Sequence, residues 1–113
     1  MTIDKNALLE RFLEYVQIDS ESRHEAAFAA RLADDLTSIG CTVSFDDSRA
    51  KTGSDTGNLY AVLPARGEGE PLLLAAHMDT VSPGRGIRPA VTDGVVRSDG
   101  SICVLGDADF TGK

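Results

Sequence analysis

The chain has 113 residues, of which 42% are hydrophobic and 26% are charged, so its length suits one domain and its composition excludes global disorder. Its 11 lysines and arginines stand against 18 aspartates and glutamates, and the net charge of -7 argues against binding to a nucleic-acid backbone. The longest strongly apolar stretch, 71–76, is far shorter than the ~20 residues that a membrane span needs, and the polar N-terminal residues are not those of a signal peptide. We therefore expect a cytoplasmic protein that binds neither nucleic acid nor membrane.

Two amphipathic helices are predicted at the start of the chain. Over 4–18, apolar residues recur every three or four positions, and Asp4 is a suitable N-cap. The second helix is predicted over 22–39, because Ser22 opens a capping-box spacing and Gly40 suits the position after a helix C-terminus. Both helices are expected to pack one face on a core.

Beyond the second helix the pattern changes to that of strands. The first of these alternates apolar and polar residues, and a polar loop over 46–57 follows it. The continuous apolar run over 71–76 predicts a strand buried on both faces. Helices followed by strands predict an α/β fold, and the chain ends where the next helix is expected, as in the first part of a larger domain. The predicted strands cover 41–45, 58–63, 71–76, 95–97 and 102–105.

A histidine and an aspartate follow the apolar run. His77 and Asp79 are two positions apart, so an extended backbone points both side chains to the same side. The carboxyl end of a buried strand is a common place for a ligand site. A metal-binding histidine usually donates its other ring N–H to a carboxylate, which fixes the orientation of the ring. This spacing therefore suits a metal ligand and its orienting carboxylate, and equally a solvated strand end followed by a turn.

A second group of carboxylates lies near the end of the chain. Asp107 and Asp109 follow a short apolar stretch and a glycine, whereas the pair 99–100 is typical of a turn between two short strands. Imidazole and carboxylate ligands together suit zinc, manganese or cobalt.

These segments resemble a known family of metalloenzymes. The segments 77–81, 83–89 and 93–100 closely resemble the peptidase T-like branch of the zinc-dependent aminopeptidase/carboxypeptidase/deacylase family. The segments 12–22 and 57–59 are similar to the N-terminal part of the same family. The resemblance implies an incomplete zinc-exopeptidase (phosphorylase/hydrolase-like) catalytic domain with a mixed sheet flanked by helices. Residues 1–113 would form its N-terminal part, without the rest of the catalytic domain and without the lid or dimerisation domain.

The resemblance also implies roles for individual residues. In that family two zinc ions share a bridging carboxylate, a histidine binds one zinc, and an aspartate two positions later orients that histidine. Here His77 would be the ligand and Asp79 the catalytic residue that orients it. The family's Gly-Ala-Asp-Asp-Lys-Ala-Gly stretch is replaced by 105–112, where Asp109 takes the bridging position after a one-residue slip and Asp107 is the alternative.

The implied activity is hydrolysis of short peptides with a free amino terminus, typically tripeptides, by water that two zinc ions activate. The family's general-base glutamate has no counterpart in the motif-bearing region, and a homodimer would form through a domain absent here. Two alternatives remain: a catalytically inactive fragment or pseudo-domain, and a carboxypeptidase or deacylase of the same family. Because His77 and one aspartate cannot complete a two-zinc site, we expect the 113-residue chain alone to bind zinc poorly and to hydrolyse no tripeptide.

Overall fold

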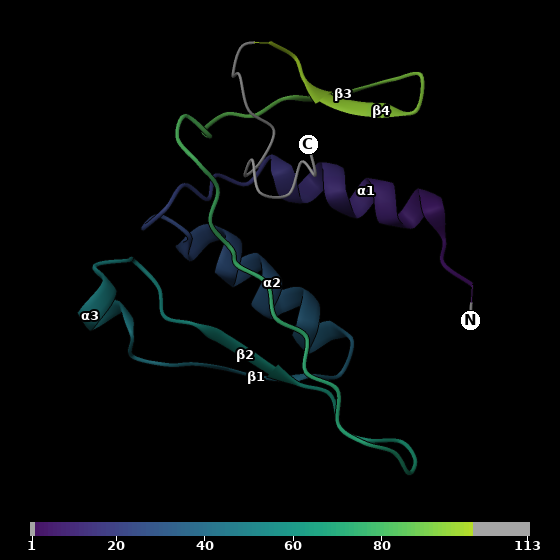
Figure 1. The fold of residues 1–113 in the computed structure, drawn as a ribbon, viewed down its shortest axis with the longest axis vertical. Coiled ribbons are helices and arrows are strands. Elements are labelled where there is room, and N and C mark those ends of the chain that lie inside the picture. Colours follow the sequence, from purple (N-terminus) through teal and green to yellow (C-terminus); the bar gives the residue numbers. More distant parts are fainter. Residues whose placement is uncertain (1, 101–113) are drawn as a thin grey trace.

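Helices and short antiparallel strand pairs make up the fold, which a computed structural model describes for residues 2–100. In chain order the elements are α1 (Lys5–Val16), α2 (Ala26–Ser38), β1 (Thr42–Phe45), α3 (Arg49–Thr52), β2 (Leu59–Val62), β3 (Pro89–Thr92) and β4 (Val95–Ser98). Figure 1 shows the β1–β2 pair and the β3–β4 pair at opposite ends of the molecule, with α1 and α2 between them. This mixture of helices and small sheets agrees with the predicted α/β class. The predicted strand over 102–105 lies outside the described residues.

Both predicted helices are present, but α2 begins later than the sequence indicates. Asp4 caps α1 as predicted, because its Oδ1 accepts two backbone N–H groups of the first turn at 3.0 and 3.1 Å. The capping box predicted at Ser22 is wrong: α2 begins at Ala26, and Glu25 at the N-cap position makes no side-chain capping bond. The backbone N–H of Ala26 instead donates to Oδ1 of Asp55 at 2.9 Å. The acceptor comes from a distant loop, which a local pattern does not show.

A polar cluster joins α1 to α2. The hydroxyl of Tyr15 in α1 donates to the carboxylate of Asp35 in α2 at 2.6 Å, and Arg31 pairs with the same carboxylate at 3.0 Å. The Tyr15 ring also packs edge-on against Phe28, with the ring centroids 5.2 Å apart. The hydroxyl of Tyr15 and the guanidinium groups around it lower the pKa of Asp35. The helices are therefore held by an aromatic contact and a charged one.

The predicted strands on either side of the 46–57 loop are confirmed. β1 and β2 pair in antiparallel fashion, with Thr42 opposite Val62 and Phe45 opposite Leu59, and α2 packs against both. The loop between them contains the short helix α3, which the sequence analysis did not predict.

A second hairpin is built by β3 and β4, of which only β4 was predicted. Its turn is formed by Asp93 and Gly94, whose φ angles of 51° and 75° are both positive. Two successive residues with positive φ are what a type I′ hairpin turn requires, and Asp-Gly is a preferred pair for it. The sequence therefore contained the signal for β3, because this pair stands immediately before an apolar strand.

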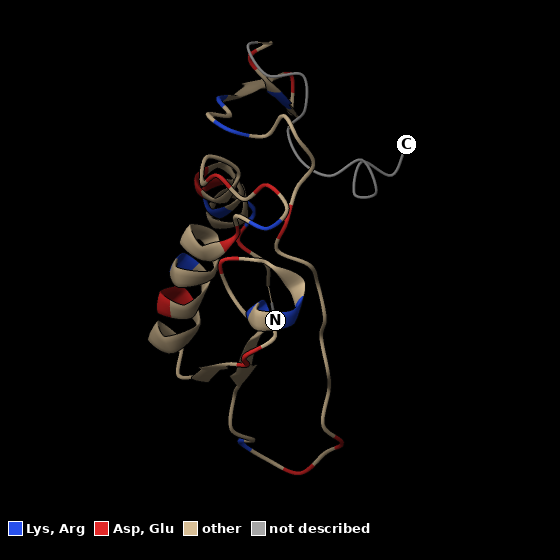
Figure 2. Ribbon diagram, turned by 90° about the vertical axis from the view of Figure 1, so that its left-hand side faces the viewer, with Lys and Arg blue, Asp and Glu red and all other residues tan. Residues whose placement is uncertain are grey.

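The buried strand predicted over 71–76 is wrong. The structure has no strand there, and Leu72, Leu73 and Leu74 are 83%, 88% and 83% exposed. Figure 2 shows this segment as part of an uncharged stretch between Glu70 and Asp79. A buried strand needs hydrogen-bonding neighbours, whereas the described strands pair only as β1 with β2 and β3 with β4. Both pairs are antiparallel, so the predicted mixed sheet is not present among residues 2–100 either.

The buried core of the described part of the chain is small. Ala29 of α2 and Ile87 are its buried apolar residues, at 1% and 5% exposure, and Ser20 is buried at 5%. Among these same residues, no helix combines the length and the apolar character that crossing a membrane takes.

Candidate functional site

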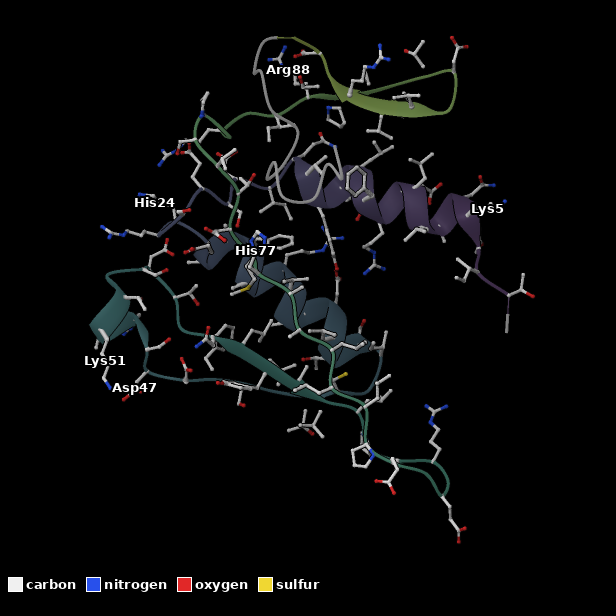
Figure 3. The ribbon with its side chains drawn as sticks, viewed as in Figure 1. Lys5, His24, Asp47, Lys51, His77 and Arg88 are labelled. Carbon is white, nitrogen blue, oxygen red and sulfur yellow. The ribbon has the colours of Figure 1, made fainter. Side chains whose placement is uncertain are left out.

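His77 and Asp79 contact one another where the chain passes α2. Nδ1 of His77 lies 2.8 Å from Oδ1 of Asp79, and the two side chains are 40% and 35% exposed. The two-residue spacing predicted this contact, and the structure contains it. When Nδ1 donates to a carboxylate, the tautomer of the ring is fixed and metal binding falls to Nε2. Figure 3 shows the other histidine, His24, well apart from His77.

The backbone around Asp79 is held by the segment that follows α1. The N–H of Thr80 donates to the carbonyl of Ser20 at 2.8 Å, and the N–H of Ser22 donates to the carbonyl of Thr80 at 3.2 Å. The buried hydroxyl of Ser20 donates to the carbonyl of Met78 at 2.6 Å. These bonds form one parallel bridge between two segments that lie far apart in the sequence. Asp79 is therefore placed by the backbone on both sides of it.

A side chain of this segment also contacts Asp79 directly. The hydroxyl of Ser22 donates to Oδ2 of Asp79 at 2.5 Å, so the two carboxylate oxygens contact different partners. The Ser22 hydroxyl is the main cause that lowers the pKa of Asp79, and the contact with His77 lowers it further, whereas partial burial opposes both. Asp79 is thus kept ionised, as a carboxylate that orients a histidine must be.

The loop after Thr80 is held by two carboxylates. Glu21 accepts the backbone N–H of Gly84 at 3.1 Å and Nε of Arg85 at 2.5 Å, while Asp19 accepts the backbone N–H of Gly86 at 2.8 Å. The pKa of Glu21 is lowered, first by a side-chain hydrogen bond from Ser82 and then by Arg85 and Gly84. A Cβ at position 84 would lie 2.6 Å from the carbonyl oxygen of Val81, so a glycine is required there. The residues on either side of Ser20 therefore fix the segment that follows the site.

A cavity of about 490 Å³ opens beside the histidine–aspartate pair. This volume lies within the range typical of small-molecule sites. Its walls come from the segment 76–79, the turn that precedes α2, and the loop that joins β1 to β2, together with Leu32 of α2 and Leu59 of β2. Polar groups that line it include those of Ser22, Arg23, Ser48, Ser54, Asn58 and His77.

The described donors fit one ligand of a zinc site. An imidazole whose Nδ1 contacts a carboxylate is a usual zinc ligand, and His77 has this arrangement. Within residues 2–100, however, no group of three or more histidine, cysteine or acidic side chains is placed to hold a metal ion. Asp109 and its alternative Asp107 lie outside the described residues, so their predicted convergence with His77 stays a prediction.

Sequence reasoning missed Ser22 and Glu21 as parts of the site. Ser22 was assigned to a helix cap, and the structure instead directs its hydroxyl to Asp79, 57 positions further along the chain. Such a pairing leaves no periodic or spacing pattern in a single sequence.

The chain is similar to several known proteins, although no model of a protein family matches it. It is 40% identical over 110 residues to the uncharacterised protein YqjE of Bacillus subtilis, across 97% of this chain and 29% of that protein. It is 34% identical over 102 residues to peptidase T of Shewanella pealeana, across 79% of this chain and 23% of that protein.

The chain is also similar to solved structures of peptidases. An aminopeptidase PepT from Bacillus cereus has a TM-score of 0.80 and 40% identity, over 88% of this chain and 27% of that one. A tripeptidase from Staphylococcus aureus has a TM-score of 0.86 and 34% identity, over 91% of this chain and 28% of that one. The chain thus spans less than a third of the length of each of these proteins.

Proposed function

From the premise that this chain is peptidase T-like in sequence and fold, and corresponds to the N-terminal portion of such proteins, we propose that it supplies part of the active site of a metal-dependent peptide hydrolase. The observation that carries the proposal is the contact between Nδ1 of His77 and Oδ1 of Asp79 at the edge of a cavity.

In this proposal His77 and Asp79 have different roles at the metal. His77 holds a zinc ion through Nε2, and Asp79 keeps the ring in the tautomer that makes this nitrogen the ligand. The zinc, when bound, polarises the scissile carbonyl and lowers the pKa of a water molecule. By resemblance, Asp109 supplies the carboxylate shared between two zinc ions, with Asp107 as the alternative. Both aspartates lie outside the described residues.

The proposed substrates are short peptides with a free amino terminus, tripeptides first. The names of two solved neighbours, an aminopeptidase and a tripeptidase, support this class. The cavity beside His77 is large enough for a small ligand, and polar residues such as Ser22 and Asn58 line it. A carboxypeptidase or deacylase activity is the alternative within the same family, and it differs in needing no free amino terminus.

The test uses the protein that carries this chain and compares a tripeptide with its N-acetylated form. We expect zinc-dependent hydrolysis of the free tripeptide, its loss on chelation and its return with added zinc. His77→Ala should abolish it, because a metal ligand is removed. His24→Ala is the matched control: it removes the chain's other histidine, which does not line the cavity, and should leave the rate unchanged.

Two results would overturn the proposal. Full zinc-dependent activity in His77→Ala would show that His77 is not a metal ligand. Preference for the acetylated peptide would replace the aminopeptidase with a deacylase or carboxypeptidase.

A further inference from the structure

We propose that Ser22 is a positioning residue for the His77–Asp79 pair. Its hydroxyl holds Oδ2 of Asp79, so that Oδ1 stays directed at Nδ1 of His77. Insofar as it concerns metal binding, this inference rests on the proposed function. The contact geometry on which it stands does not.

The carboxylate of Asp79 needs a second contact to act as an orienting group. A carboxylate can turn about its Cβ–Cγ bond and present either oxygen to a donor. In the structure one oxygen accepts from the Ser22 hydroxyl at 2.5 Å and the other contacts the His77 ring at 2.8 Å. With both oxygens engaged, rotation of the carboxylate breaks two contacts, and the plane that faces the ring is fixed. Hydrogen bonds to ionised groups are also stronger than neutral ones.

The hydroxyl of Ser22 has no part in holding the backbone. The N–H of Ser22 donates to the carbonyl of Thr80, and the N–H of Thr80 donates to the carbonyl of Ser20. The buried hydroxyl of Ser20 adds a third hydrogen bond between the two segments, because it donates to the carbonyl of Met78. Nor does Ser22 cap α2, which begins four residues later. Removing this hydroxyl should therefore leave the bridge in place and release Asp79 alone.

Ser22 also tolerates the substitutions that the test needs. Its side chain is exposed, so alanine leaves no buried cavity. Ser22→Ala removes the donor, and Ser22→Thr keeps it.

The test is the tautomeric state of the His77 ring, read from the ¹⁵N shifts of its two nitrogens at one pH at which the ring is neutral. We expect the native chain to show mainly the tautomer protonated on Nδ1. Ser22→Ala should lose most of this preference and show a mixture, and Ser22→Thr should restore it. His24, the chain's other histidine, is an internal control whose ring signals should not change.

A second readout concerns zinc affinity in the protein that carries the chain. Loss of a partner behind a metal-binding histidine typically weakens metal affinity by about 10- to 100-fold, and Ser22→Ala should fall near the lower end because Asp79 itself remains. An unchanged His77 tautomer in Ser22→Ala would overturn the positioning role and leave the proposed function standing. A changed tautomer in a protein that binds no zinc would support the positioning role and overturn the proposed function.

Discussion

At the scale of single residues, Asp46 is the carboxylate that accepts the most hydrogen bonds among residues 2–100. Its oxygens accept the hydroxyl and backbone N–H of Ser48, the amide and backbone N–H of Asn58, and the hydroxyl of Tyr60. These donors hold the pKa of Asp46 well below its usual range, the Ser48 hydroxyl most of all. A Cβ on Gly57 would lie 2.7 Å from Oδ1 of Asp46, so the loop closes tightly around this charge.

The lowered pKa of Asp46 makes the stability of the fold depend on pH. A carboxylate with a lowered pKa in the folded state stabilises that state above its unfolded pKa, about 3.9. This stabilisation is lost as the pH falls below that value toward the folded pKa. We expect Asp46→Asn to lower the free energy of unfolding in urea at pH 7, and the gap from the native chain to narrow below about pH 4.

The neighbouring Asp47 gives the matched control for this experiment. It is exposed and accepts none of these hydrogen bonds, and Figure 3 shows it near Lys51 of α3. Asp47→Asn should therefore leave the unfolding curves at both pH values close to those of the native chain. A constant gap between Asp46→Asn and the native chain at all pH values would show that lost hydrogen bonds, and not ionisation, account for the change.

Residues that act within a few positions of one another were predictable, and those that act across the chain were not. His77 and Asp79 are two positions apart, and this spacing alone was enough to predict that their side chains meet. Ser22 reaches Asp79 only because a parallel bridge brings distant segments side by side. A serine hydroxyl can cap a helix or donate to a carboxylate equally well. Which of the two it does depends on the backbone arrangement, and the residues near Ser22 do not specify that arrangement.

At the scale of elements, α1 offers a direct test of a predicted cap. Oδ1 of Asp4 accepts the N–H groups of Asn6 and Ala7. We expect Asp4→Ala to destabilise the chain by about 1 kcal/mol, the usual cost of losing such a cap, as measured by thermal unfolding followed by circular dichroism. Asp4→Ser keeps a side-chain acceptor and should lose much less. If serine cost as much as alanine, the charge on Asp4 near the helix dipole, and not the cap, would be the source of the stability.

Elements with local signals were the predictable ones. α1, β1, β2 and β4 follow from periodicity and from the caps and turns beside them. The start of α2 was misplaced because its first N–H is satisfied by Asp55 of a later loop. The apolar run over 71–76 has the composition of a buried strand, but composition specifies neither a pairing partner nor a covering layer. The described strands supply neither to this segment.

At the scale of the whole molecule, the side chains of residues 2–100 that could bind a metal predict little metal binding by the 113-residue chain on its own. His77 is the proposed ligand among residues 2–100, and within this range no group of three or more histidine, cysteine or acidic side chains is placed to hold a metal ion. A catalytic zinc usually has three protein ligands and a water molecule. We therefore expect less than one equivalent of zinc to remain after dialysis, as measured by metal analysis. Retention of two equivalents would show that Asp107 or Asp109 and other residues complete the site.

The exposed leucines of the apolar run favour self-association of the chain. Leu72, Leu73 and Leu74 are more than four-fifths exposed and adjacent, and runs of exposed apolar residues favour association, unlike isolated ones. We expect the sedimentation coefficient of the chain to rise with concentration and Leu73→Asp to suppress the rise. Thr2→Asp adds the same charge at an exposed position outside the apolar run and should associate as the native chain does. Equal suppression by both variants would assign the effect to net charge, because the apolar segment is altered in only one of them.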